Sequence, residues 1–256
     1  MTAGALRVSV VVPTYNPGEC LDRLVASLLR QSLPANEFEV IFVDDGSTDA
    51  TPARLDALAA AHRHFHVLHA ERSGWPSRPR NLGVAQASGE YVQFVDDDDW
   101  LADEALARLY GYAAENGADI AIGRMAGHGR SVPRELFRVN RPDATLADAP
   151  LMESLTCHKM FRRAFLSQHD LRFPEEGRKR LEDHHLVTRA TTSPPLGSSR
   201  RDTSAACVRS STSSTRTPSR VRCVTGCTSG GCASRWSAGC AAPGCATRLA
   251  TGSTRW

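Results

Sequence analysis

The sequence predicts an α/β protein in which a mostly parallel sheet carries helices on both faces. Over residues 1–123, short runs rich in β-branched residues alternate with segments whose leucines recur at helical spacing. Such alternation is typical of parallel strands joined by crossover helices. Polar residues directly follow three of the expected strands. Because ligands of open parallel sheets bind beyond the carboxyl ends of the strands, we expect a site at that edge.

Five strands are expected, each a short run of apolar and β-branched residues. The first is a valine-rich run that ends at Pro13, and the second ends where Asp44, Asp45 and Gly46 begin a turn. The third is the weakest, and the fourth is the aromatic and β-branched run before four consecutive aspartates. The expected strands cover residues 8–12, 38–43, 66–69, 91–95 and 119–122.

Four helices are expected between these strands. Leu21, Leu24 and Leu28 recur at helical spacing, and Pro52 stands at an early helical position, where proline is favoured. The expected helices cover residues 21–29, the segment from Thr51 to Leu58, residues 81–87 and residues 101–110. Residues 124–150 are rich in Gly, Arg and Pro and predict a connection, and apolar periodicity returns over 151–190.

The last 66 residues differ in composition from the rest. Residues 191–256 hold nine Arg and one acid. The chain's net charge of +3 therefore combines this basic tail with residues 1–190, which carry a net negative charge. This tail has 13 Ser and 11 Thr but only two Leu, too little apolar surface to offset the cost of ordering. It is either a natural disordered tail or, the interpretation that we favour, the product of a reading-frame error in a GC-rich gene. An RNA- or anion-binding arm is a third interpretation, without a supporting motif.

Composition and missing motifs exclude several classes. No stretch of 18 apolar residues is present, and residues 8–12 are interpreted as a buried strand rather than part of a signal peptide. Neither common Gly-rich phosphate loop occurs, which argues against a P-loop ATPase or a dehydrogenase. Cys20 and Cys157 are expected to be packing residues, and the tail cysteines have no zinc-site spacing.

The most informative stretch is the aspartate run that follows the fourth expected strand. Four adjacent carboxylates repel each other, and burial penalises each charge, so a cation would stabilise them. Oxygen ligands favour a hard ion, Mg²⁺ or Mn²⁺, which usually completes its shell with phosphate. The alternative is a solvated loop that caps the next helix. The run is Asp96-Asp97-Asp98-Asp99.

Four segments together resemble the family 2 glycosyltransferases, which have the GT-A fold. They occur in the family's order and cover residues 11–16, 43–49, 78–83 and 94–99. The resemblance extends over about residues 6–190. A proline stands directly before Arg80-Asn81, and this form of the motif resembles that of relatives that decorate cell-wall polymers such as teichoic acids. The resemblance implies a donor-binding GT-A core over 1–123 and a linker with the acceptor-side and general-base segment over 124–190. The composition of 191–256 makes that part an irregular tail.

The resemblance also implies a donor site. Asp45 would accept a hydrogen bond from a nucleobase, and the side chains of the first strand end would line base and ribose. Arg80 would approach the nucleotide through phosphate or a base edge. The nucleotide-sugar-binding residues implied are Pro13, Thr14, Tyr15, Asn16, Asp45, Arg80, Asn81, Asp96 and Asp97. Each also has a plain structural interpretation as a turn, helix-cap or surface residue.

A metal site and a catalytic base are implied in the same way. Asp96 and Asp98 align with the family's metal motif, with Asp98 as the direct ligand of Mg²⁺ or Mn²⁺. Asp183 would be the general base of an inverting transfer and Glu182 its neighbour or alternate. His184 and His185 are adjacent, so they face different directions on a helix and are interpreted as structural or acceptor-side residues. The basic residues at 178–180 would meet phosphate or solvent equally well.

The expected function is transfer of a sugar from a nucleotide-diphosphate sugar, with a UDP-sugar favoured, to a glycan, wall-polymer or lipid hydroxyl. The alternative is a truncated or frameshifted member that binds the donor but lacks a complete acceptor site. No nucleic acid partner is expected. The expected location is the cytoplasm, with peripheral association at the inner face of the membrane as an option. Sugar, acceptor and oligomeric state do not follow from the sequence.

Overall fold

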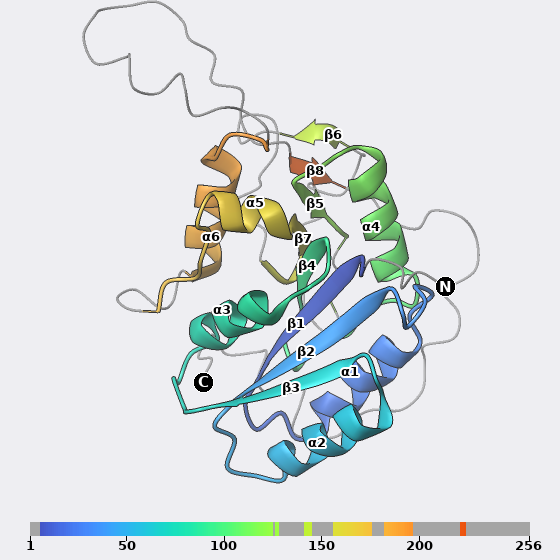
Figure 1. Cartoon of the computed structure of the whole chain (residues 1–256), viewed down its shortest axis with the longest axis vertical. Coiled ribbons are helices and arrows are strands. Elements are labelled where there is room, and N and C mark those ends of the chain that lie inside the picture. Colours follow the sequence, from blue (N-terminus) through green and yellow to red (C-terminus); the bar gives the residue numbers. More distant parts are fainter. Residues whose placement is uncertain are drawn as a thin grey trace, which may run out of the picture.

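A computed structural model describes residues 6–124, 126–127, 141–144, 156–175, 182–196 and 221–223. These residues form one sheet with helices packed on it (Figure 1). Its strand order is β3-β2-β1-β4-β7-β5-β8-β6. The strands are β1 Val8–Thr14, β2 Phe38–Asp45, β3 Phe65–Ala70, β4 Tyr91–Phe94, β5 Ile120–Ile122, β6 Arg141–Ala144, β7 Lys159–Arg162 and β8 Val221–Cys223. The helices are α1 Cys20–Leu29, α2 Thr51–Ala61, α3 Ser77–Gln86, α4 Ala105–Glu115, α5 Arg163–Gln168 and α6 Glu182–Thr192, with a 3₁₀ turn at Thr156–His158.

The first four strands are parallel and form the half of the sheet that carries the site. β1 pairs with β2 and β4, and β2 pairs with β3, all in parallel. Every residue of β1 and β2 is buried, as expected for strands covered on both faces. Parallel pairing brings the carboxyl ends of β1, β2 and β4 to one edge, because all three strands run in the same direction.

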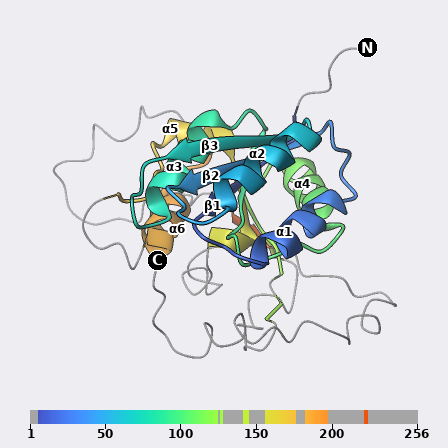
Figure 2. The same ribbon diagram turned by 90° about the horizontal axis from the view of Figure 1, so that it is seen from below.

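Helices cover both faces of the sheet (Figures 1 and 2). On one face, Leu24 of α1, Leu55 of α2 and Leu106 of α4 pack with Val10 and Val12 of β1. On the other face, residues from α3, α5 and α6 pack against the alternate side chains of the same strands, among them Leu82, Phe165, Leu186 and Val11. The alternation of side chains along each strand therefore divides the core into two layers.

The expected fold class is confirmed, with two differences that affect the site. α3 begins at Ser77, whereas a helix was expected from residue 81, so Arg80 lies in the first turn of this helix. β7 was not expected at all: it lies antiparallel between β4 and β5, with Gln93 opposite Met160. Four residues give too short a pattern to distinguish a strand from other local structure, and its partners lie far away in the chain.

Parts of the expected tail are included in the fold. Residues 191 and 192 end α6, where Thr191 is buried, and Leu196 beyond the helix packs against the core. Residues 221–223 add strand β8 beside β5. The rest of 197–256 lies outside the described residues, as do 128–140 and 145–155 of the expected linker segment and the basic residues at 178–180. None of the described helices is long and apolar enough to span a bilayer.

Gly83 sets the distance between α3 and the sheet. A Cβ at this position would collide with the buried side chain of Val11 in β1. We expect Gly83→Ala to lower stability by about 1–3 kcal/mol, the usual cost of overpacking, seen as a lower Tm. Gly111→Ala in α4 is the matched control, since a Cβ there meets nothing within 4 Å. It should be neutral or stabilise by up to ~1 kcal/mol. Equal Tm values for the two variants would contradict the role of Gly83 in setting the distance between α3 and the sheet.

Candidate active site

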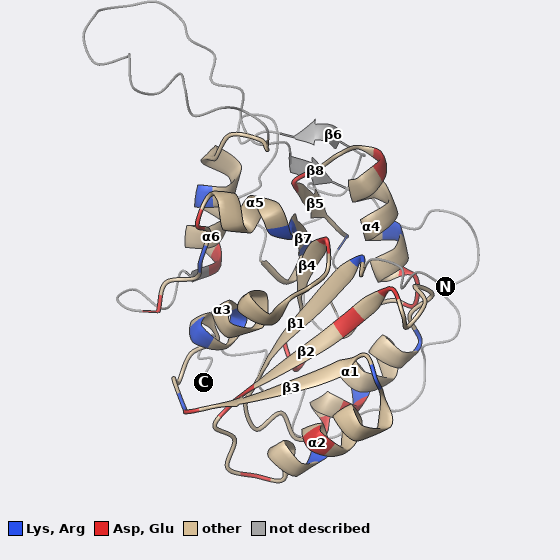
Figure 3. Ribbon diagram, in the orientation of Figure 1, with Lys and Arg blue, Asp and Glu red and all other residues tan. Residues whose placement is uncertain are grey.

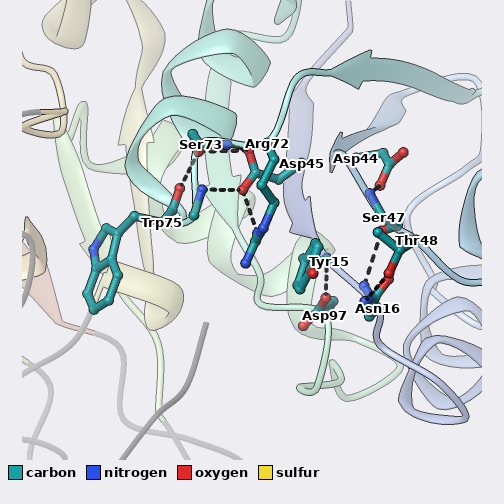
Figure 4. Close-up of polar contacts among 11 residues, drawn as sticks. Tyr15, Asn16, Asp44, Asp45, Ser47, Thr48, Arg72, Ser73, Trp75 and Asp97 are labelled. Atoms are coloured by element: carbon teal, nitrogen blue, oxygen red, sulfur yellow. Dashed lines mark hydrogen bonds and ion pairs between the residues drawn. The ribbon is translucent and has the colours of Figure 1, made fainter.

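Three strand ends meet at the carboxyl edge of the parallel half, as the sequence predicts. The backbone N–H of Tyr15, after β1, donates to Asp97, after β4, at 3.0 Å. The backbone N–H of Asn16 donates to Ser47, after β2, at 3.1 Å. Figure 4 shows these contacts side by side. The three loops therefore form one polar surface, although the residues that meet there are up to 82 positions apart in the chain.

Asp45 anchors the loop that follows β3. Its Oδ1 accepts from the N–H and the hydroxyl of Ser73 at 2.8 and 2.7 Å. Its Oδ2 accepts from Arg72 Nη1 at 2.8 Å and from the N–H of Gly74 at 3.0 Å. The residue is only 3% exposed, so these donors offset the cost of burying its charge. Asp45 is therefore part of the wall of the site, and it holds the next loop in place.

A small hollow lies beside Asp45. Four of the residues that the sequence predicts as donor contacts help line it: Pro13, Thr14, Tyr15 and Asp45. Three others come from the loop before α3 and its first turn: Trp75, Pro76 and Pro79. The Arg72 guanidinium carbon lies 3.2 Å from the centroid of the Tyr15 ring, so the ring is already stacked on one side. The prolines and aromatic rings give this small hollow mostly apolar walls, with the Asp45 carboxylate at its edge.

Asn16 shapes the turn rather than the hollow. It has a left-handed φ of 47°, a conformation that Asn tolerates better than most residues. Its side-chain oxygen accepts from the N–H of Thr48 at 2.9 Å, and its amide donates to the Thr48 hydroxyl at 3.1 Å. Asp44 closes the same turn by accepting from the N–H of Ser47 at 3.0 Å. A nucleotide contact of Asn16 stays a prediction.

The aspartate run folds into a turn in which its members have different environments. The N–H of Asp99 donates to the carbonyl of Asp96 at 3.1 Å. Asp98 is exposed, whereas Asp97 is 5% exposed and turned toward Tyr15. Burial raises the pKa of Asp97 to about 8, and the charges of Asp98 and Asp96 add to this shift while the N–H of Tyr15 opposes it. Asp97 is thus suited to hold the loops together.

Asp96 and Asp99 lie on one side of this turn, with Cys157 beside them. One carboxylate oxygen of each and the Cys157 Sγ all lie within 4.8 Å of one another. Two hard oxygen donors fit a divalent cation, and a sulfur atom adds affinity for softer ions. Burial and the nearby charges of Asp96 and Asp99 raise the pKa of the Cys157 thiol well above its usual range. The interpretation of Cys157 as a packing residue stays a prediction. Its place beside Asp96 and Asp99 did not follow from the sequence, because residue 157 is distant in the chain.

Arg80 connects the acidic turn to the expected base. Its Nη2 lies 2.7 Å from Asp96 Oδ1, and its Nη1 lies 3.4 Å from Asp183 Oδ1. Helix α6 begins at Glu182, and Asp183 is its second residue. The side chain of Glu182 lies outside the described residues. The structure therefore brings Asp96, Asp183 and Arg80 together at the same edge of the sheet.

Asn81 joins α3 to the segment before α6. Its amide donates to the carbonyl of Phe173 at 3.0 Å and to Glu175 at 2.8 Å, and its oxygen accepts from the N–H of Phe173 at 3.0 Å. These contacts attach Phe173 and Glu175 to α3. The sequence did not indicate this role, and a nucleotide contact of Asn81 stays a prediction.

The fold and this edge define a doubly wound α/β protein with an acidic turn beside a small hollow at the carboxyl edge of its sheet. A family model described as "Glycosyl transferase family 2" matches residues 9–170, which is more than half of the chain. The chain belongs to this family, and the resemblance seen in its four motifs is confirmed.

Several relatives are named as poly(ribitol-phosphate) glycosyltransferases. The chain is 37% identical over 174 residues to a poly(ribitol-phosphate) beta-glucosyltransferase of Bacillus spizizenii, covering 66% of this chain and 27% of the relative. It is 36% identical over 192 residues to the poly(ribitol-phosphate) beta-N-acetylglucosaminyltransferase TarS of Staphylococcus aureus, covering 72% and 32%. The crystal structure of S. aureus TarS 1–349 in complex with UDP-GlcNAc has a TM-score of 0.70 at 29% identity, covering 86% of this chain and 56% of that one. The chain thus spans about a third or less of these two curated relatives.

Proposed function

We propose that this chain carries the donor-binding and base-bearing part of an inverting glycosyltransferase. The observation that carries the proposal is Asp183, which Arg80 holds beside the acidic turn at the carboxyl edge of the sheet. The donor would be a nucleotide-diphosphate sugar and the acceptor a hydroxyl. The named activities of the wall-polymer relatives and the UDP-GlcNAc complex of TarS support this class of reaction.

The donor nucleotide would bind in the hollow beside Asp45. A carboxylate accepts well from the imide N–H of uracil, and the prolines and Tyr15 offer flat surfaces for the base. One Asp45 oxygen can take such a bond by releasing or sharing a donor of the 72–74 loop. A UDP-sugar is therefore the favoured donor, and the UDP and UDP-GlcNAc complexes of TarS support the choice.

A divalent cation, Mg²⁺ or Mn²⁺, would be held by the acidic turn. Asp96 and Asp98 are the proposed ligands, and Asp99 lies close enough to Asp96 to take part. When bound, such an ion neutralises the charge that develops on the diphosphate leaving group. Asp97, buried and turned toward Tyr15, would support the loop that carries these ligands.

Asp183 would be the general base. Its carboxylate takes the proton of the acceptor hydroxyl as the oxygen attacks the anomeric carbon. The attack comes from the face opposite the diphosphate, so the new C–O bond forms as the old one breaks, and the bonding pair leaves with the nucleotide. Glu182, the preceding residue, is the proposed neighbour or alternate base. The polyol-phosphate chains named for the relatives make such a polymer the favoured acceptor class.

Donor binding and turnover test this proposal separately. Calorimetry with UDP and with a panel of nucleotide diphosphates, with and without Mn²⁺, measures the donor site. Release of UDP from a panel of UDP-sugars, with and without polyol-phosphate polymers, measures turnover. We expect UDP binding that Mn²⁺ strengthens, and transfer to a polymer hydroxyl. Binding without any transfer would instead support the alternative, a chain that binds the donor but lacks a complete acceptor site.

The metal ligands are tested by comparing neighbouring aspartates. We expect Asp98→Ala to remove the Mn²⁺-dependent part of UDP binding, about 1.5–3 kcal/mol for the loss of a charged contact. Glu104→Gln is the control, because Glu104 is exposed and pairs only with Arg108 among the described contacts. If Asp98→Ala keeps the Mn²⁺ effect while Asp99→Ala loses it, the ion is held by the Asp96–Asp99 pair instead. Calorimetry at fixed salt concentration measures both.

A further inference from the structure

Arg80 has the surroundings of a structural connector, and its expected nucleotide contact stays a prediction. Its side chain is only 3% exposed, and its two terminal nitrogens are directed at carboxylates from two different segments. Its guanidinium carbon lies 5.1 Å from the centroid of the Phe173 ring. Asp96 follows β4 and Asp183 belongs to α6, 103 residues from Arg80 in the chain. Figure 3 marks basic residues on α3 and the acidic beginning of α6.

The geometry makes Arg80 the shared partner of both acids. A buried guanidinium is retained only when it is paired, and its rigid fork can bond two carboxylates in fixed directions. Lysine has one nitrogen, a point charge on a flexible stem, and cannot fix two directions in this way. The Arg80 side chain therefore links Asp96 and Asp183 directly.

We propose that Arg80 is a positioning residue that links cation binding at the acidic turn to the placement of the base Asp183. This inference rests on the proposed function for the roles of the two acids. A cation that approaches Asp96 competes with the guanidinium for the same carboxylate. When the cation takes over Asp96, the Arg80 fork remains with Asp183, so the base is held more firmly when the donor's cation is bound.

The linkage has a definite sign. Removing the guanidinium frees Asp96 for a cation and removes a nearby positive charge, so Arg80→Gln should tighten Mn²⁺ binding by roughly two- to tenfold. The neutral amide of Asp183→Asn attracts the guanidinium less than a carboxylate does, so Arg80 pairs more strongly with Asp96 and the variant should weaken Mn²⁺ binding. This weakening should shrink in the Arg80→Gln background, because only the direct effect of the lost charge remains there.

The experiment is a double-mutant cycle on Mn²⁺ affinity, measured by calorimetry on wild type, Arg80→Gln, Asp183→Asn and the double variant. Asp170→Asn is the matched control, because Asp170 is an exposed Asp that pairs with Arg172 and keeps a left-handed φ of 45° that Asn also tolerates. The control should leave the affinity unchanged. Additive effects in the cycle, or weaker Mn²⁺ binding by Arg80→Gln, would overturn the inference. So would weaker binding of metal-free UDP by Arg80→Gln, since that result makes Arg80 a nucleotide contact.

A second readout uses turnover. Arg80→Lys keeps the charge but cannot bond both acids. Because the base Asp183 is then misplaced, kcat for transfer should fall by roughly tenfold or more. The KM for the donor should stay the same, because the hollow is intact. A rise in donor KM without a change in kcat would contradict a positioning role.

A third readout needs no ligand and separates this inference from the proposed function. Thermal unfolding of the same four proteins should give non-additive Tm changes, because Arg80 and Asp183 stabilise each other directly. If wild type transfers no sugar and binds no Mn²⁺, the proposed function fails, and the Tm cycle still decides whether Arg80 holds Asp183. Additive Tm changes would overturn the link whatever the outcome of the activity assays.

Discussion

Asp183→Asn is expected to abolish sugar transfer while nucleotide binding stays intact. The amide keeps the shape of the side chain and can still accept from Arg80, but it cannot take the proton of the attacking hydroxyl. General-base catalysis contributes about 10²–10⁴-fold, and we expect a loss in kcat of that size. The hollow beside Asp45 lies on other elements, so the Kd for UDP without metal should be unchanged. Initial rates of UDP release and calorimetry measure the two effects on one protein preparation.

The control for Asp183 separates the loss of a base from the loss of a charge. Asp170→Asn makes the same chemical change at an exposed site and should leave kcat within about twofold, as surface substitutions usually do. His184→Ala tests the neighbouring position, which is exposed on α6. If Asp183→Asn keeps most of its transfer rate, the base lies elsewhere, and Glu182→Gln becomes the decisive variant.

Asp45→Asn is expected to weaken UDP binding by about 1.5–3 kcal/mol, roughly 10- to 150-fold in Kd at 25 °C. An amide replaces one of the two carboxylate oxygens, each of which accepts two donors of the 72–74 loop. The variant thus loses the acceptor for the nucleobase N–H, and the wall of the hollow becomes looser. Calorimetric titration of UDP measures the change.

Two comparisons show whether the effect of Asp45→Asn comes from a lost contact with the nucleobase. Asp44→Asn changes the adjacent residue, whose carboxylate bonds Ser47 and His69 on the other side of the strand, and UDP binding should persist. Pyrophosphate has no base, so its affinity should be the same in wild type and in Asp45→Asn. Equal losses for UDP and pyrophosphate would contradict a base contact and indicate a general collapse of the site.

The local parts of this protein could be predicted from its sequence. The helices around Leu24 and Leu55 follow from apolar spacing, and the turns at Gly46 and after Phe94 follow from residues that end strands. Such signals depend on neighbours in the chain, so they survive without knowledge of the fold. The parallel half of the sheet and its polar edge were predicted on this basis, whereas the four motifs were recognised by their resemblance to the family. The strand of residues 159–162 was not, because its place is decided by distant partners.

The candidate site divides in the same way. The sequence by itself determined that carboxylates follow β2 and β4, and that a Glu-Asp pair stands near residue 183. Only the tertiary structure decided that Arg80 bonds both Asp96 and Asp183, that Cys157 lies beside Asp96 and Asp99, and that Trp75 helps line the hollow. The physical reason is chain separation: a residue type shows what a side chain can bond, while its partner 103 residues away is chosen by how the helices pack on the sheet.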